Sequence, residues 1–322
     1  MNSVRLQHFL TRNTYLFSLL LLAILLSVNY SLQDNLFELR VLNNSMRTLL
    51  PLILLAVGQS VVVIGGGIDL SVGTMVSMLV AMLVKLITVE SSATDIALAV
   101  LAACGAGMAA GSLNGLAVSY LRLQPIVTTY ATSFIFSGIA LLLLPRPGGQ
   151  IPTELRRFYA QTPYGVPLSF YVIGVLLLLW TLIRSTRYAQ YLFATGSNSQ
   201  AAYTSGVPVR AVRFSTYVWA GFFAGLAATA LTFSTGSGQA NIGDNMTLDS
   251  IVAVVLGGTR LSGGKGGIAG AIIGVMILRV IRNVIFFADV PTWSQTLVNA
   301  LIIIAALAGP GLFGLVRRMV KK

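Results

Sequence analysis

Two glycine-rich polar breaks interrupt long apolar runs in this sequence. The first glycine motif reads Gly-Gly-Gly-Ile-Asp-Leu-Ser-Val-Gly over 65–73, and the second reads Gly-Gly-Thr-Arg-Leu-Ser-Gly-Gly over 257–264. Non-helical backbone is tolerated in a bilayer only where it is buried in protein, lines a water-filled path or lies at the membrane surface. Two copies in corresponding settings therefore indicate an internally repeated transport protein with discontinuous helices.

The composition supports an integral membrane protein. The chain has 322 residues, of which 56% are hydrophobic and only 9% are charged, whereas soluble domains carry roughly 25% charged residues. The net charge of +12 comes from basic residues scattered at predicted helix ends, which argues against nucleic acid as a partner. One cysteine, Cys104, and one histidine, His8, leave little material for a metal site or for His-based catalysis. We therefore expect no enzyme, no metal and no cofactor.

Hydropathy predicts an all-α polytopic bundle with about ten membrane spans, since a span needs about 20 mainly apolar residues. The first run is better explained as a retained helix than as a signal peptide, because no small-residue cleavage site follows it. The eighth span is short and adjoins the second glycine motif, as a discontinuous helix would. The predicted spans are 14–31, 46–64, 71–89, 96–118, 125–145, 167–184, 214–234, 247–258, 267–288 and 292–309.

Charge sorting predicts that both termini face the cytoplasm. With that orientation most of the 21 basic residues lie in inner segments, as the positive-inside rule requires. Every acidic residue except Asp69 falls on the outer side. The whole chain, 1–322, is expected to be one transmembrane domain, with a cytoplasmic loop at 184–213 and a proline-rich outer loop at 146–166 that is too short for a catalytic domain.

Small residues recur at a spacing of four, which places each set on one helix face. Such faces let two helix backbones approach closely, so these glycines predict tight packing and say nothing about substrate. The sets are Gly107, Gly111 and Gly115; Gly221 and Gly225; and Gly266, Gly270 and Gly274.

Asp69 and Arg260 occupy equivalent places in the two glycine motifs. They could form an ion pair or line the pathway. Alternatively, each caps a helix end, with Asp69 and Ser71 supplying oxygens to the first N–H groups of the next helix; we favour this alternative. The segment 258–266 lacks the residues of a phosphate-binding loop, so ATP-driven transport would need an ATPase on another chain.

Neutral hydrogen-bonding side chains and aromatic rings lie inside several predicted spans. They suit an uncharged, polyhydroxylated substrate, although bonds between helices are an equally good explanation for any one of them. No predicted span carries an acidic residue near its centre, which argues against an ion relay. The predicted pathway residues are Gln59, Asn114, Thr128, Thr129, Thr132, Ser133 and Phe134.

The inner loop contains Ser-Gln-Ala-Ala-Tyr at 199–203, which predicts a short helix ending near Gly206. A short helix between two spans can act as a rigid lever for a soluble partner. A plain surface loop is the alternative.

Three segments in this order resemble the permease subunits of bacterial ABC importers of the ribose/monosaccharide type, which are distantly related to branched-chain amino acid permeases. The matching segments are 66–73, 194–207 and 249–264. By this resemblance, Gly196, Asn198, Ala201, Ala202 and Gly206 couple the chain to an ATPase. Ser199 and Gln200 depart from a Pro-Glu pair that is common in the family. The resemblance also marks seven structural motif positions: Gly66, Gly67, Asp69, Ser71, Gly257, Gly258 and Arg260.

The resemblance implies an inner-membrane permease that works with a cytoplasmic ATP-binding subunit, a periplasmic sugar-binding protein and a second permease copy or paralogue. A small neutral sugar is the expected substrate. A branched-chain amino acid or a furanosyl signal molecule is the alternative within transport. An ion-coupled secondary carrier, which would need no ATPase, is the alternative from another class.

Overall fold

The computed structural model describes residues 15–289, 291, 293–295, 297, 298, 300, 301 and 304. His8 and most of the predicted span 292–309 lie outside the described residues. The described part is helical, apart from loops and one isolated bridge between Gly148 and Gly238. The helices are α2 (Tyr15–Leu32), α3 (Leu39–Ile64), α4 (Val72–Leu86), α5 (Ala93–Ser119), α6 (Pro125–Leu143), α7 (Thr153–Tyr159), η1 (Pro163–Gly165), α8 (Leu168–Arg184), α9 (Arg187–Ser197), α10 (Ser199–Thr204), α11 (Val209–Thr235), α12 (Met246–Leu256) and α13 (Ile268–Phe287).

Within the described residues, five helices are long and apolar enough to cross a membrane, or six if the bent pair of α7 with η1 and α8 counts as one span. The helices α2, α4 and α12 are apolar but shorter. The chain is therefore an all-helical, multi-pass bundle, as the hydropathy predicted.

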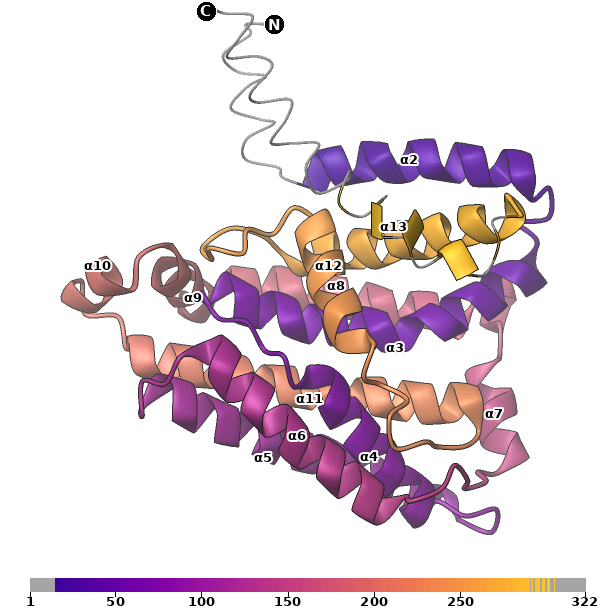
Figure 1. Cartoon of the computed structure of the whole chain (residues 1–322), viewed down its shortest axis with the longest axis horizontal. Coiled ribbons are helices and arrows are strands. Elements are labelled where there is room, and N and C mark those ends of the chain that lie inside the picture. The colour runs from indigo at the N-terminus through magenta and orange to yellow at the C-terminus, as the bar shows by residue number, and fades with distance from the viewer. Residues whose placement is uncertain are drawn as a thin grey trace, which may run out of the picture.

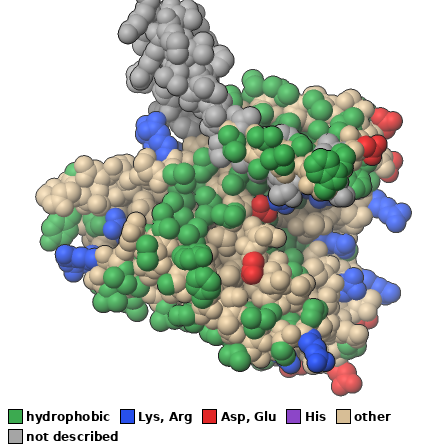
Figure 2. Space-filling model, viewed as in Figure 1, with side chains coloured by type: hydrophobic (Ala, Val, Ile, Leu, Met, Phe, Trp, Pro, Cys, Tyr) green, Lys and Arg blue, Asp and Glu red, His purple; other side chains and the backbone are tan. Residues whose placement is uncertain are grey.

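The two predicted hydrophilic loops lie at opposite ends of this bundle (Figure 1). The helices α9 and α10 project from one end, which we call the α10 end, and α7 lies at the other, the α7 end. Figure 2 shows charged side chains mostly at these two ends, with hydrophobic side chains prominent between them. This distribution is typical of a protein whose middle lies in hydrocarbon.

The helix α3 forms the centre of the core. Of its most apolar window, 89% is buried inside the protein, against 28% for α6 and 33% for α5. A helix that is hydrophobic on every side is buried, and α3 contacts α8, α11, α12 and α13. The outer helices present large apolar residues such as Leu142 on their free faces.

Glycines bring α5 and α11 into backbone contact. A Cβ atom at Gly107 would collide with the Gly221 carbonyl oxygen, and one at Gly221 would collide with that of Gly107. A Cβ at Gly225 would lie 2.7 Å from the Cα of Cys104. The predicted close packing is confirmed for this pair of helices.

The third set of glycines serves the α12–α13 contact in the same way, with one correction. Cβ atoms at Gly270 and Gly274 would collide with backbone atoms of Gly257 and Ala253. Gly266, however, is not on the helix face, because α13 begins at Ile268. Its φ of +141° belongs to the preceding loop, where glycine has little conformational cost.

The helices α4 and α12 begin inside the bundle and not at its ends (Figure 1). Sequence patterning predicted a span over 71–89, but α4 has only 15 residues, or about 22 Å at 1.5 Å per residue. The apolar core of a bilayer is about 30 Å thick, so α4 does not cross it alone. The first glycine motif occupies the missing length as non-helical chain. The predicted discontinuity at α12 is confirmed, since that helix has 11 residues.

Candidate functional site

The first glycine motif closes α3 with a Schellman cap. Gly66 has φ +82°, its N–H donates to the Val63 carbonyl oxygen at 3.0 Å, and the Gly67 N–H donates to Val62 at 3.0 Å. These bonds satisfy carbonyls that a helix end otherwise leaves free. Only glycine adopts this conformation at little cost.

The second glycine motif closes α12 with the same cap. Gly258 has φ +83°, its N–H donates to Val255 at 2.9 Å, and the Thr259 N–H donates to Val254 at 3.1 Å. The sequence repeat is thus a structural repeat, since each motif ends an apolar helix and turns the chain in one geometry.

The end of α9 joins the two glycine motifs at the α10 end of the bundle. The Gly264 N–H donates to the Ile64 carbonyl oxygen at 2.9 Å, which links the second motif to the last residue of α3. A Cβ at Gly196 would collide with that same oxygen and lie 2.6 Å from the Gly264 nitrogen. A Cβ at Gly263 would lie 2.7 Å from the Gly196 carbonyl oxygen. Three segments far apart in sequence therefore meet with backbone in contact.

The predicted short helix is present as α10. The Asn198 side chain accepts hydrogen bonds from the N–H groups of Gln200 at 3.1 Å and Ala201 at 3.0 Å, which is an N-cap. Its end is a third Schellman cap, in which Gly206 has φ +81°. Ala202 is buried, whereas Ser199, Gln200 and Tyr203 are exposed. The exposed face is free to contact another molecule.

The helix α9, which the sequence analysis did not predict, ties α10 to the core. Leu192 is fully buried, and the Tyr188 hydroxyl lies 2.9 Å from Ser215 Oγ on α11. Burial raises the pKa of Tyr188, so the hydroxyl stays protonated. Tyr188 and Leu192 are four residues apart, with mostly polar or small residues between them. This helical spacing of apolar residues could have revealed α9.

The N-terminal turns of α4 and α12 lie against each other inside the bundle. The Gly73 N–H donates to Thr247 Oγ1 at 2.9 Å. Ser77 Oγ accepts from the Gly243 N–H at 2.9 Å and donates to Asp244 Oδ1 at 2.8 Å. We call this contact the half-helix junction. Helix N-termini carry partial positive charge, and two of them meet here.

Carboxylates lie near both N-termini of the junction. Asp69 is fully buried, and its Oδ1 accepts from Ser71 N–H at 2.8 Å and from Ser71 Oγ at 2.6 Å. Asp249 lies in the first turn of α12. The sequence analysis placed Asp249 on the outer side of the membrane and found no acidic residue near the centre of a span. Asp69 and Asp249 lie within the bundle because α4 and α12 begin there. Asp69 accepts from Ser71, and Asp249 accepts from Arg282.

Asp69 and Arg260 do not pair. Arg260 is exposed, and the ion pair found within the described residues joins Arg282 to Asp249. Asp69 instead belongs to a buried network in which Asn114 Nδ2 donates to Ser71 Oγ at 2.8 Å and Thr132 Oγ1 donates to Asn114 Oδ1 at 2.7 Å. The predicted capping is not found, because neither Asp69 nor Ser71 caps the first N–H groups of α4 with its side chain. Asp69 accepts instead from Ser71, the residue before the helix, and the Arg260 N–H closes a loop onto the Lys265 carbonyl oxygen.

The seven predicted pathway residues do not converge on one space. Thr129 Oγ1 accepts from the Leu70 N–H at 2.9 Å and so joins Asn114 and Thr132 around the first glycine motif. Gln59 is fully buried on α3, and neither of its amide atoms has a hydrogen-bond partner in the described part of the chain. The remaining three lie on α6: Thr128 and Ser133 bond their own helix backbone, and Phe134 is 62% exposed.

A cavity of about 700 Å³ with a mixed polar and apolar lining lies elsewhere, between the α2–α3 turn, the first turns of α3 and the last turns of α13. The sequence analysis noted arginines near these helix ends but assigned them no site. The available signal was the spacing of the polar residues: Asn44 and Thr48 are four residues apart on α3, and Arg279 and Asn283 are four residues apart on α13. Residues with this spacing share one helix face. The polar lining side chains include Asn44, Ser45, Thr48, Arg279, Arg282 and Asn283. Within the described residues, no cluster of His, Cys, Asp or Glu could hold a metal.

Comparison with known proteins identifies the family. The family model described as branched-chain amino acid transport system / permease component matches residues 41–307. The chain belongs to this permease family. The ribose import permease RbsC of Escherichia coli K12 is 31% identical over 298 residues, covering 90% of this chain and 91% of the relative.

Two further relatives of this permease family extend the comparison. The ribose import permease RbsC of Bacillus subtilis 168 is 32% identical over 258 residues, which is 79% of each chain. The autoinducer 2 import system permease LsrC of Escherichia coli K12 / DH10B is 32% identical over 266 residues, covering 81% of this chain and 76% of the relative. No solved structure matches. The permease is accordingly a multi-pass transport subunit of the bacterial inner membrane and not an enzyme.

Proposed function

We propose that this permease forms the path by which an ABC importer takes up a small neutral sugar, a monosaccharide such as ribose. The names of relatives from two distant bacteria, each covering most of both chains, support the substrate class. The observation that carries the transport mechanism is the meeting of Gly196, Gly264 and Ile64 at one end of the bundle. A close-packed contact of this kind transmits displacement, because backbone atoms have no room to give way.

The proposed mechanism is alternating access driven from another chain. The exposed face of α10 would dock on a cytoplasmic ATP-binding subunit, and closure of two such subunits would displace α9 and α10. The displacement would pass to the end of α3 and to the loop after α12. The end of α3 leads through the first glycine motif to the start of α4, and the loop after α12 follows the last residue of that helix. Movement of either would therefore rotate one of the two half-helices that meet at the half-helix junction and change the opening between α4 and α12. Rigid-body motion of packed helices is a common form of such switching.

The proposed assembly has further members. A periplasmic sugar-binding protein would deliver the substrate at the α7 end, and a second permease copy or paralogue would complete the pathway within the lipid bilayer. We further propose ten spans with both termini in the cytoplasm. In this arrangement the α10 end faces the ATPase, and the proline-rich loop 146–166 faces the periplasm.

The pathway residues predicted from sequence stay a proposal. Asn114, Thr129 and Thr132 would act near the first glycine motif, and Thr128, Ser133 and Phe134 along α6. Cysteines placed at positions 128–134 should react with a small hydrophilic thiol reagent during turnover. Lack of reaction at every position while the importer is active would remove α6 from the pathway.

The autoinducer 2 permease supports a second candidate substrate, a furanosyl signal molecule, because this relative is 32% identical to the chain, as similar as the ribose permeases are. A branched-chain amino acid is the third, from the family description. All three substrates can be compared in proteoliposomes that contain the permease, its ATPase and its binding protein. We expect ATP-dependent uptake of labelled ribose that excess unlabelled ribose abolishes and leucine does not. Uptake driven by a sodium or proton gradient without the ATPase would refute the ABC importer.

A further inference from the structure

The cavity between α3 and α13 has the mixed polar and apolar lining of a ligand site. Its volume of about 700 Å³ falls within the range of small-molecule sites, about 300–1,000 Å³. Asn44 and Thr48 lie one turn apart on α3, and Arg279 and Asn283 lie one turn apart on α13. Each pair shares one helix face, and both faces line the cavity. Polar side chains from two helices thus converge on one space.

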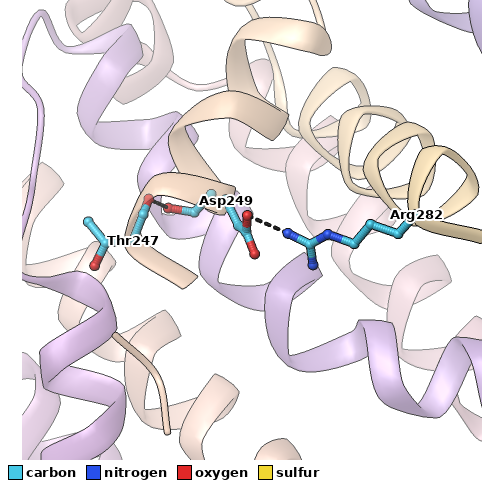
Figure 3. A network of polar contacts seen from close by, with 4 residues as sticks. Thr247, Asp249 and Arg282 are labelled. Atoms are coloured by element: carbon cyan, nitrogen blue, oxygen red, sulfur yellow. Dashed lines mark hydrogen bonds and ion pairs between the residues drawn. The ribbon is translucent and has the colours of Figure 1, made fainter. Parts of the chain in front are cut away.

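Among the residues that the structure describes, one arginine of the cavity has no acidic partner. Arg282 Nη2 donates to Asp249 Oδ1 at 2.6 Å, and this pair ties α13 to the first turn of α12 (Figure 3). The ion pair found within the described residues does not include Arg279, whose Nε is buried with no hydrogen-bond partner. The Arg279 side chain lines the cavity, so its guanidinium group is placed to donate to an oxygen acceptor of a ligand there.

The cavity is placed where a substrate would enter. Its lining residues come from the first turns of α3 and the last turns of α13, and these helix ends lie toward the α7 end, opposite α9 and α10 (Figure 1). Arg279 lies eight residues before the last residue of α13, which is about 12 Å along the axis. Next to it, the Arg282–Asp249 pair reaches the N-terminal turn of α12 and hence the half-helix junction. Transporter sites commonly lie beside such half-helix N-termini.

We propose that this cavity is a low-affinity sugar site, in which Arg279, Asn44, Thr48 and Asn283 bind the hydroxyl groups of a monosaccharide. The proposal rests on the proposed uptake function and names a binding site for its substrate. Amide and hydroxyl groups both donate and accept hydrogen bonds, as sugar hydroxyls do. Phe286 and Phe287 also line the cavity and offer apolar surface to the C–H face of a sugar ring.

The chemistry favours a neutral ligand over an anion. A dedicated anion site would direct both guanidinium groups at the ligand, but Asp249 already engages Arg282. The remaining lining is mostly neutral, with Gln33, Asn44, Ser45, Thr48 and Asn283. A sugar with several hydroxyls uses all of these groups, whereas a single phosphate uses few.

The test is the number of sugar molecules imported per ATP hydrolysed. Both quantities are measured in the same proteoliposomes, which hold the complete importer with Arg279→Gln or Asn44→Ala in the permease. Loss of one hydrogen bond to a charged donor corresponds to about a ten-fold to hundred-fold change in binding. We expect the ratio to fall about ten-fold in Arg279→Gln, and less in Asn44→Ala, while ATP hydrolysis stimulated by the binding protein persists.

The control is Lys85→Gln, which removes an exposed cation from the end of α4 without touching the cavity. Its ratio should match that of the native protein. An unchanged ratio in both cavity variants would overturn the site. A parallel loss of transport and of stimulated ATP hydrolysis would also overturn it, because these residues would then serve assembly or coupling.

A second measurement separates this site from the proposed function. In a Cys104→Ser background, Asn44→Cys in the detergent-purified permease is labelled with a hydrophilic thiol reagent. We expect ribose at high concentration to slow labelling there and not at Gln161→Cys, an exposed position outside the cavity. Protection by ribose would support the site even if uptake failed. Protection by ribose 5-phosphate alone, or by neither compound, would contradict a neutral-sugar site.

Discussion

Replacement of Gly196 by alanine tests the proposed coupling most directly. The new Cβ would collide with the Ile64 carbonyl oxygen and lie 2.6 Å from the Gly264 nitrogen, which are the two partners of a 2.9 Å hydrogen bond. Overpacking in a filled site costs about 1–3 kcal/mol, and loss of that bond costs about 0.5–1.5 kcal/mol. Alanine gains roughly 0.5–1 kcal/mol within a helix. The net expectation is a loss of about 1–3 kcal/mol, concentrated where three segments meet.

The matched control is Gly138→Ala, because Gly138 is a helix glycine with nothing within 4 Å of its added Cβ. It receives the helix gain without the collision. The assays are thermal melting of the purified permease and ATP hydrolysis stimulated by the binding protein in the reconstituted importer. We expect Gly196→Ala to insert in the membrane, melt at a lower temperature and lose stimulation, while Gly138→Ala behaves like the native protein. Equal melting and equal stimulation in the two variants would refute the coupling role.

Three further predictions follow from the same geometry. Gly66→Ala should destabilise the permease by about 1–2 kcal/mol, because φ is +82° there and left-handed backbone penalises a Cβ; Gly148→Ala should cost much less, and equal melting temperatures would contradict this. Asp69→Leu should abolish uptake and lower stability by about 1–3 kcal/mol, since it leaves buried donors unsatisfied, whereas Asp69→Asn should keep the fold, as circular dichroism during heating would show. Reporter fusions within 184–213 should score cytoplasmic and those within 146–166 periplasmic, and the reverse result would overturn the orientation.

The sequence alone determined the features that depend on local chain properties. Hydropathy revealed the apolar helices, because burial in lipid requires long uncharged runs. The two glycine motifs marked where α3 and α12 end, and there Gly66 and Gly258 adopt positive φ. The helix α10 was predictable as well, since the Asn198 cap and Gly206 lie within a few residues of it. In each case the determining contacts lie within about one helical turn.

The tertiary structure decided which helices meet, and with them the site. Helical spacing could have placed Arg279 and Asn283 on one face, but no local rule indicated that Asn44 on α3 would face them across a cavity. Likewise Phe134 resembled a lining residue and lies exposed on α6, whereas Asp69, which sequence placed near a membrane surface, is fully buried against Asn114. The physical reason is that periodicity fixes one helix face, while the partner of that face depends on how every other helix packs into the bundle.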